Sequence, residues 1–486
     1  MRPIVFIALA SPLLFTSCAP SGVSRREREP NRAEYAHRFY TCSAQIDSVL
    51  SDSAFTHAFI GIKVVSVRSG EELYELNSEK LFRPASNIKL FTAAAALALL
   101  GGDFEFKTEV FVVEQPGKRR PSLILKGHGD PLLTENDLDS LAAQVSASGI
   151  RDVEDLIADV SYFDNVCWGR GWMWDDDPGG DWPYISPLSV DRNVLKLIVA
   201  PGKSPGRSAD VRFQRPVSSV CLTARVLTAS DTTRSSLRMY RRWDGQNDTI
   251  VLEGVVPTAE RPKLIEVTVR RPEMQALALF KEKLAIHGVS VAGTLRVEPE
   301  GGGHRIAFVA HRLDSVAVVL NRESYNLAAE NVLKTLAAQR LGQPGTAAGG
   351  ITLLKQYLQS MGIDTTALTL ADGSGVSRYN LAAPSQIIQL LLAAQRDSSL
   401  RDTFIRSLPM AGMNGTLKNR MANGQAFGNA RAKTGTHTDA VALSGYVTDA
   451  GGELLAFSIM FNHFVGNVPG YRTLQDRIVE ILANCK

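Results

Sequence analysis

The feature that constrains this fold most is a long break between two helix-rich parts of the sequence. An Ala/Leu-rich stretch predicts a helix that begins near Ser86, ends at Leu100 and is stopped by Gly101-Gly102. Short β-like runs follow from about residue 103 to 311, and long amphipathic helices return only after His311. This order indicates that the first and last segments form one split domain with an insertion between them.

Periodicity predicts the remaining helices and strands. Between about 197 and 262 turn signals interrupt alternating runs and no helix is expected, which predicts a small all-β module nested in the larger insertion. The expected helices span 32–52, 135–148, 273–287, 324–341, 351–361, 385–395 and 471–484. The expected strands span 59–67, 72–76, 106–113, 122–125, 265–269, 305–310, 431–433, 442–447 and 454–462.

Charge and hydropathy exclude several classes of protein. The 486 residues carry 53 Lys+Arg against 50 Asp+Glu, a net charge of +3, and 44% are hydrophobic. This apolar content excludes an intrinsically disordered chain, and the small charge argues against a nucleic-acid partner held by gross positive charge. No run of about 20 apolar residues lies in the body of the chain, which excludes a polytopic membrane protein. At about 150 residues per domain, the length suggests two to four domains.

The N-terminus is typical of an exported bacterial protein. Arg2 precedes an apolar run, 3–15, and small residues then surround Cys18, which is the layout of a secretory signal. The cysteine after small residues resembles a lipobox, in which Cys18 would be diacylated and anchor the mature chain to a membrane. Ordinary cleavage and a buried structural Cys18 are the alternatives. Residues 1–18 are therefore interpreted as a lipoprotein signal peptide and 19–33 as a solvated tether, with the protein in the periplasm or cell envelope.

The cysteine and histidine spacings give no support for a metal site. Of the five cysteines, Cys42, Cys167, Cys221 and Cys485 remain after the signal peptide, and none forms a CxxC pair; no HExxH occurs. An oxidising compartment permits disulfides, and spacing alone cannot choose among the three pairings.

Three short motifs suggest nucleophilic catalysis. In Ser86-x-x-Lys89 the two side chains share a helix face, and the helix N-terminus favours a neutral Lys that can take the Ser proton. Ser324-Tyr325-Asn326 offers a hydroxyl that can relay a proton and an amide that can hold both the Lys and a substrate carbonyl. Lys433-Thr434-Gly435-Thr436 offers a carboxylate cradle, in which Gly435 lets the backbone approach the ligand. Taken singly, the first motif is more typical of an N-cap Ser with a solvated Lys, the second is equally typical of an ordinary capping sequence, and the third has a surface turn as its alternative.

Together, and in this order, the motifs form the signature of serine β-lactamases and penicillin-binding proteins. The chain resembles the D-alanyl-D-alanine carboxypeptidase/endopeptidase family, the DacB type of low-molecular-mass (class C) penicillin-binding proteins, over nearly all of its length after the tether. Four further blocks carry the resemblance: Gly129-Asp130-Pro131, 171–176, 372–378 and Gly415-Thr416-Leu417. The long gap between Ser86 and Ser324 also leaves room for the two inserted domains of that family.

The resemblance implies an α+β multidomain protein. Its catalytic domain would be of the β-lactamase/penicillin-binding transpeptidase type, with helices flanking an antiparallel sheet, and would carry two β-rich insertions. Its parts are expected at 34–102 and 312–486, with inserted domain II at 103–196 and 263–311 and domain III at 197–262.

The resemblance also implies a role for each motif residue. Ser86 would be the acylated nucleophile and Lys89 its general base, while Ser324 would pass a proton to the leaving amine. Backbone N–H groups would form the oxyanion hole. The remaining expected roles are Asn326 on the substrate amide, Lys433, Thr434, Gly435 and Thr436 around the terminal carboxylate, Ser86 and Thr436 as oxyanion donors, and Asp176 toward the cationic end of the stem peptide.

Other residues receive more modest expectations. Asp176 could instead cap a turn. Tyr325 is expected to point away from the key side chains, and His437 to lie exposed at the rim of the cleft, with substrate contact or a pH-dependent role as alternatives. Residues 372–378 are expected to shape the floor of the site. Trp168, Trp172 and Trp174 are expected to form a packing cluster.

The implied activity is hydrolysis of peptidoglycan stem peptides ending in D-Ala-D-Ala, or of their cross-links, without cofactor or metal. β-Lactams would be covalent inhibitors, and no nucleic-acid partner is expected. A penicillin sensor without turnover and a β-lactamase or esterase on the same fold are the competing hypotheses; sensors usually carry transmembrane helices and a signalling domain, which this sequence lacks. In this fold the terminal helices lie side by side, which implies a Cys42–Cys485 disulfide and leaves Cys167–Cys221 as the second pair.

Overall fold

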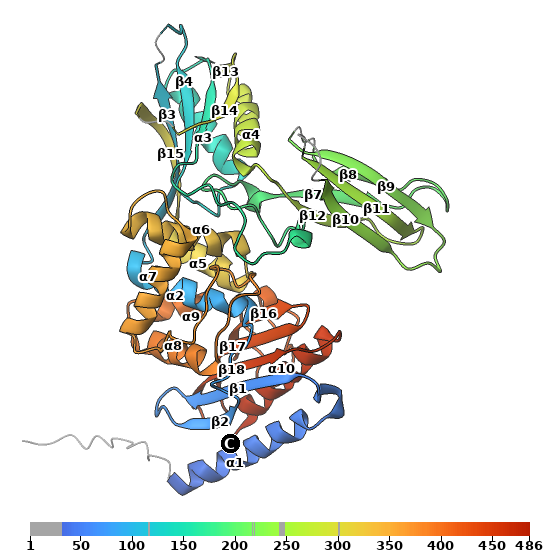
Figure 1. The fold of residues 1–486 in the computed structure, drawn as a ribbon, viewed down its shortest axis with the longest axis vertical. Coiled ribbons are helices and arrows are strands. Elements are labelled where there is room, and N and C mark those ends of the chain that lie inside the picture. The colour runs from blue at the N-terminus through green and yellow to red at the C-terminus, as the bar shows by residue number, and fades with distance from the viewer. Residues whose placement is uncertain (1–31, 115–116, 216, 218, 243–247, 300–301) are drawn as a thin grey trace, which may run out of the picture.

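The computed structural model describes residues 32–486 except 115–116, 216, 218, 243–247 and 300–301 (Figure 1). The predicted signal peptide, Cys18 and the tether up to residue 31 lie outside the described residues. The last two tether residues belong to helix α1 (Arg32–Leu50). Within the described part of the chain, no helix is both long enough and apolar enough to cross a membrane.

One antiparallel sheet joins the two ends of the chain. Its strand order is β16-β17-β18-β1-β2, so strands from the C-terminal segment pair with strands from the N-terminal one. The N-terminal and C-terminal segments thus share a single sheet with β16 at its edge. The strands are β1 (Phe59–Ser66), β2 (Glu72–Leu76), β16 (Arg431–His437), β17 (Ala440–Thr448) and β18 (Leu454–Asn462).

Successive side chains along the strands of this sheet point to opposite faces and pack in two hydrophobic cores. Leu443 and Ile459 pack in the core beneath α1 and α10 (Val468–Asn484), whereas Ala442 and Met460 pack in the core of the helical layer on the other face. Figure 1 shows α1 and α10 side by side on one face of the sheet and a layer of helices from the same two segments of the chain on the other. The helical layer contains α2 (Ile88–Leu100), α5 (Leu313–Arg322), α6 (Asn326–Arg340), α7 (Ala347–Ser360), α8 (Pro384–Arg396) and α9 (Arg401–Ser407); α5 and α9 were not predicted.

The insertion forms a second α/β layer above the helices (Figure 1). A five-stranded sheet of order β14-β6-β4-β3-β15 packs against α3 (Glu135–Ala147) and α4 (Pro272–Ile286) around one core. Its strands are β3 (Glu105–Val113), β4 (Ser122–Gly127), β6 (Leu156–Asp159), β14 (Leu295–Val297) and β15 (His304–Arg312), and a separate pair joins β5 (Asp152–Val153) to β13 (Ser290–Val291).

A β module projects from this layer (Figure 1). It contains two three-stranded sheets of order β10-β11-β9 and β12-β7-β8. Strand β12 pairs with β7, although the boundaries expected at 197 and 262 put β12 and the start of β7 in the neighbouring domain. The strands are β7 (Val194–Ala200), β8 (Asp210–Phe213), β9 (Cys221–Ala229), β10 (Ser236–Arg242), β11 (Thr249–Pro257) and β12 (Lys263–Thr268).

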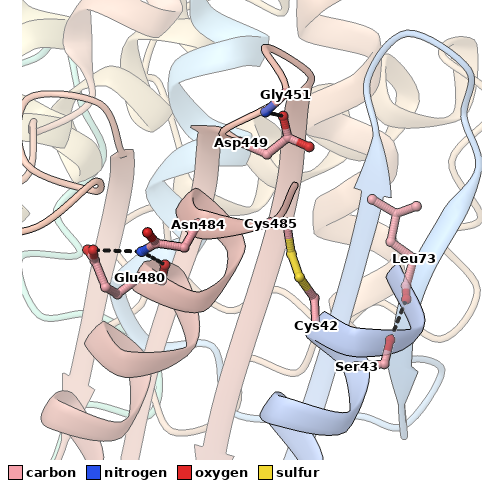
Figure 2. The surroundings of a disulfide bond; sticks show 8 residues. All are labelled: Cys42, Ser43, Leu73, Asp449, Gly451, Glu480, Asn484 and Cys485. Carbon is pink, nitrogen blue, oxygen red and sulfur yellow. Dashed lines mark hydrogen bonds between the residues drawn. A yellow bond between two sulfur atoms is a disulfide. The ribbon is translucent and has the colours of Figure 1, made fainter. Parts of the chain in front are cut away.

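A disulfide between Cys42 of α1 and Cys485 after α10 closes the split domain (Figure 2), which confirms this implied pairing. The second pairing is wrong, because Cys167 and Cys221 are exposed free thiols. The backbone of each cysteine bonds to a different segment. The carbonyl oxygen of Cys167 accepts a hydrogen bond from Ile185 N, whereas Cys221, at the start of β9, donates its backbone N–H to the carbonyl oxygen of Asp248. The two cysteines thus belong to different layers of the insertion.

Candidate active site

The serine expected as nucleophile lies on a single 3-10 turn that leads into α2. Ser86 is the middle residue of Ala85–Asn87, and α2 begins at Ile88. Ala85 has a positive φ of 48°, which is an unfavourable conformation for a residue with a Cβ. Such strain is found where the surrounding structure fixes the chain, and here it fixes the residue that precedes Ser86.

Lys89 connects three elements of the site. Its Nζ lies 3.0 Å from Ser86 Oγ, 2.6 Å from Asn326 Oδ1 and 2.6 Å from the Ser374 carbonyl oxygen. The last two partners can only accept, so they take two N–H bonds and leave the third contact for the Ser86 hydroxyl. A neutral amine in this position accepts the Ser86 proton.

Burial makes a neutral Lys89 accessible near neutral pH. The side chain is completely buried, and this loss of hydration lowers the pKa of Lys89 to about 7. The nearby carboxylates of Asp372, Glu330 and Asp181 oppose the effect but do not cancel it. The pKa of Lys89 is therefore lowered, as predicted. The main cause is burial and not the helix N-terminus on which the prediction was based.

The second lysine of the site faces Ser324. Lys433 Nζ donates to Ser324 Oγ at 2.8 Å and to the Thr434 carbonyl oxygen at 2.8 Å. Burial, followed by repulsion from Lys89, lowers the pKa of Lys433 well below its usual value. Ser324 and Lys433 thus form a pair in which a proton can move easily.

The local backbone turns Ser324 and Asn326 toward the lysines. Ser324 precedes α6 and has a positive φ of 60°, so the helix begins at Asn326 rather than at Ser324 as predicted. Asn326 Nδ2 donates to the Asp181 carbonyl oxygen at 2.6 Å, which fixes the amide with Oδ1 toward Lys89. Tyr325 points away, as expected: its ring is buried, and the guanidinium of Arg192 lies 4.9 Å from the ring centre.

Strand β16 passes close to the nucleophile turn. A Cβ on Gly435 would lie 2.6 Å from the Pro84 carbonyl oxygen, so only glycine allows this approach. Thr434 Oγ1 contacts Thr416 Oγ1 at 2.8 Å, and Arg472 donates to Thr436 Oγ1 at 2.9 Å.

These side chains surround a cleft of about 430 Å³. Of the nine residues expected for catalysis or substrate binding, five lie in its wall, and Lys89 and Lys433 form hydrogen bonds to wall residues. A larger hollow of about 600 Å³ beside α5 contains none of them, so we take the smaller cleft as the site. The lining residues are Ser86, Asp181, Trp182, Glu323, Ser324, Asn326, Gly375, Val376, Thr416, Arg420, Thr434, Thr436, His437 and Arg472.

Gly375 and Val376 of the predicted floor loop, residues 372–378, line the cleft. Glu330 of α6 accepts hydrogen bonds from Gly373 N at 3.1 Å and Ser374 N at 2.8 Å, which holds the loop whose carbonyl meets Lys89. Asp372 accepts from Gly375 N at 2.8 Å, from Ser377 N at 2.6 Å and from Trp172 Nε1 at 2.9 Å. Burial, reinforced by Asp372, raises the pKa of Glu330 to about 7.

Asp176 lies outside the cleft wall. Its Oδ2 accepts from Met173 N at 2.9 Å and pairs with Arg378 at 3.2 Å, so it caps a turn, which was the alternative interpretation, and anchors the floor loop. Trp168 and Trp172 pack edge to face at 5.2 Å, but Trp174 is 75% exposed and does not belong to the expected cluster.

His437 is not the exposed rim residue that was expected. Its side chain is half-buried, and Nε2 lies 3.0 Å from the Gly375 carbonyl oxygen, so the ring bridges β16 and the floor loop. Burial and the neighbouring Arg378 lower the pKa of His437.

Sequence reasoning missed several polar residues of the site. Glu330 lies one helical turn after Asn326 on α6, and this spacing could have placed it on the same face. No sequence pattern pointed to Asp181, Arg420 or Arg472, because they come from two loops and a helix that only the fold brings to the cleft.

Three comparisons relate this chain to known proteins. The profile of the D-Ala-D-Ala carboxypeptidase 3 (S13) family matches residues 42–485. The D-alanyl-D-alanine carboxypeptidase of Actinomadura sp. (strain R39) is 37% identical over 457 residues, which cover 90% of this chain and 84% of that protein. The DacB carboxypeptidase of Haemophilus influenzae is 27% identical over 420 residues, or 83% and 85% of the two chains. The crystal structure of penicillin binding protein 4 (dacB) from H. influenzae has the same α+β fold with several sheets, with a TM-score of 0.80 at 24% identity, covering 90% of this chain and 99% of that chain.

Proposed function

The chain belongs to the D-Ala-D-Ala carboxypeptidase 3 (S13) family, and from this premise we propose that it cleaves the D-Ala-D-Ala bond through an acyl-enzyme on Ser86. It is a serine-type D-Ala-D-Ala carboxypeptidase that binds penicillin and acts on peptidoglycan. The observation that carries the assignment of the residues is the buried Lys89 amine, 3.0 Å from Ser86 Oγ.

Acylation begins with proton transfer. Neutral Lys89 takes the proton of Ser86, and Oγ attacks the carbonyl carbon of the penultimate D-Ala. The negative charge that develops on the carbonyl oxygen is stabilised by the backbone N–H groups of Ser86 and Thr436. The placement of Thr436 is supported by its position on β16, since an edge strand leaves alternate N–H groups without a strand partner.

Collapse of the tetrahedral intermediate breaks the C–N bond. The leaving D-Ala amine needs one proton, which Ser324 supplies; the proton that Lys89 took from Ser86 then restores the Ser324 hydroxyl, which Lys433 holds at 2.8 Å, and leaves Lys89 neutral. Water then attacks the ester carbon, and Lys89 takes the water proton and returns a proton to Ser86 Oγ. Free acid and unmodified enzyme result.

Substrate binding is assigned to both walls of the cleft. Asn326 holds the substrate amide, while Lys433, Thr434 and Thr436 surround the terminal carboxylate next to Gly435. For Asp176, contact with the cationic end of the stem peptide requires that the incoming amine displace Arg378 from the carboxylate.

The N-terminus and the insertion complete the proposal. The family places the protein in the cell envelope, and Cys18 is proposed as a lipidated anchor there. The catalytic domain is assigned to 34–102 and 312–486, with two domains inserted between them. The pairing of β7 with β12 supports limits near Val194 and Thr268 for the β module. Metabolic labelling with a radioactive fatty acid, lost in Cys18→Ala, tests the anchor.

A labelled penicillin tests the nucleophile. The wild type is expected to form a stable covalent adduct, and Ser86→Ala to form none. An undiminished adduct in Ser86→Ala would contradict the assignment. Incubation with stem peptides and with cross-linked dimers then separates the activities: free D-Ala reports carboxypeptidase action, released monomer reports endopeptidase action, and an adduct without either product would favour a sensor.

A further inference from the structure

The side of the cleft formed by β16 carries a cation that the catalytic steps do not use. Arg472 lies in the second turn of α10, lines the cleft and is exposed to solvent. Its guanidinium donates to Thr436 Oγ1 at 2.9 Å, and Thr436 belongs to the proposed carboxylate cradle.

No ion pair joins this guanidinium to an acidic side chain in the described part of the chain. Asp476, one helical turn later on α10, is held instead by Arg420, which donates to it from Nε at 3.0 Å and from Nη2 at 2.7 Å. Among the described residues no carboxylate oxygen forms an ion pair with Arg472. Of the five N–H donors of this guanidinium, one faces Thr436, and others remain available to an incoming group.

Arg420 holds the Arg472 backbone in place. Its Nη2 donates to the Arg472 carbonyl oxygen at 3.1 Å and to Gln475 Oε1 at 3.1 Å. Arg420 pairs with Asp476 and supports the turn of α10, so the carboxylate nearest to Arg472 along this helix is bonded to another guanidinium. An arginine fixed by one neutral hydroxyl and facing a cradle of hydroxyls is suited to a carboxylate, which it can bind with two parallel hydrogen bonds.

We infer that Arg472 is a specificity-determining residue, which binds the free α-carboxylate of the residue released by cleavage. The inference rests on the proposed function, in which this carboxylate lies at Thr434 and Thr436. It extends to the substrate class: the leaving residue must carry a free carboxylate, whether it is a terminal D-Ala or an amino acid within a cross-link. A leaving residue whose carboxylate is amidated is disfavoured.

Arg472 contributes equally to the bound substrate and the transition state, since the carboxylate is charged in both. Replacement of Arg472 is therefore expected to raise KM, with little change in kcat. A structural defect of the cleft would instead lower kcat as well.

The test uses two peptides that differ only at the C-terminus: one ends in D-Ala-D-Ala carboxylate and the other in D-Ala-D-Ala carboxamide. The ratio of their kcat/KM values is measured for the wild type, Arg472→Gln and Arg472→Lys. The matched control is Arg477→Gln, the same substitution at an exposed position of α10 outside the cleft wall. Arg472→Gln is expected to lower the ratio about 10- to 100-fold, and Arg472→Lys to retain part of the preference.

An unchanged ratio in Arg472→Gln, or an equal fall in Arg477→Gln, would overturn the inference. If the carboxamide is turned over too slowly, the acylation rates of benzylpenicillin and its methyl ester give the same ratio. Ser86→Ala distinguishes the two failures: persistent hydrolysis in that variant would contradict the proposed function, whereas an unchanged ratio in an enzyme that depends on Ser86 contradicts only the role of Arg472.

Discussion

The floor and the mouth of the active-site cleft hold their charges in different ways. On the floor, Lys89, Glu330 and Asp372 are buried, and each bonds to at least two fixed groups of neighbouring elements. At the mouth, Arg472 and Asp181 are exposed. Burial shifts the pKa values of Lys89 and Glu330 to about 7, so the floor is suited to proton transfer, whereas the exposed charges of the mouth are suited to recognition of a charged ligand.

This difference predicts that changes on the floor alter rate and pH dependence, whereas changes at the mouth alter substrate preference. β16 connects the two regions: Lys433 belongs to the floor, Gly435 contacts the nucleophile turn, and Thr436 faces the mouth.

The largest effect is expected for Lys89→Met, which keeps the length of the side chain and removes the base. We expect kcat/KM for D-Ala release to fall by at least about 10³-fold, because no other described side chain bonds to the Ser86 hydroxyl. Penicillin acylation should fall in parallel. Thermal unfolding is the control, since a buried Met replaces an amine whose charged form burial disfavours; a variant that folds and still acylates at the wild-type rate would contradict the role of Lys89.

A smaller loss is expected for Gly435→Ala, at the junction between the two regions. The new methyl group would meet the Pro84 carbonyl oxygen, so β16 must move away from the nucleophile turn. A displacement of this kind should lower kcat/KM about 10- to 100-fold and reduce both acylation and the carboxylate preference. Steady-state kinetics on the carboxylate and carboxamide peptides measure both effects, and a loss confined to either one would contradict the close approach.

Glu330→Gln should shift the pH profile. The wild-type rate is expected to rise with pH through about 7, as Lys89 loses its proton. The carboxylate of Glu330 raises the pKa of Lys89, so its replacement by a neutral amide lowers that pKa and moves the acid limb to lower pH. At the plateau, a weaker hold on the floor loop should reduce kcat/KM by about tenfold. An unmoved acid limb would show that Glu330 and Lys89 are not coupled.

Much of the fold could be predicted from the sequence because its elements are strongly periodic. The break after Leu100, the glycine stop and the return of helices after His311 predicted that the two ends of the chain belong together, and they share one sheet; the three motifs pointed to residues that meet in the cleft. Helices α5 and α9 were missed. They span only Leu313–Arg322 and Arg401–Ser407, and such short segments contain too few turns for a helical pattern to stand out.

The features that could not be predicted depend on the surroundings of each residue. Ala85 and Ser324 adopt positive φ values that their sequence does not favour, because tertiary contacts fix both turns. His437 became a bridge to Gly375 and Asp176 a partner of Arg378, and both contacts join segments that are distant in sequence. The wrong Cys167–Cys221 pairing was reached by elimination, and elimination does not test whether two side chains can meet.

The smallest effect on activity is expected for Cys42→Ser, which lies outside both regions of the cleft. The disulfide links residues 443 positions apart and joins α1 to the end of α10, on the face of the sheet opposite the helical layer that carries Ser86 (Figure 2). Its loss should lower the free energy of unfolding by about 2–5 kcal/mol, since the unfolded chain regains freedom. The rate of D-Ala release should change by no more than about twofold. Helix α10 also carries Arg472, and its packing on the sheet is expected to hold it in place without the disulfide. Denaturant unfolding and kinetics on the same sample, with Cys167→Ser as the exposed free-thiol control, measure both quantities. A marked loss of the carboxylate preference in folded Cys42→Ser would show that the disulfide also positions the mouth of the cleft.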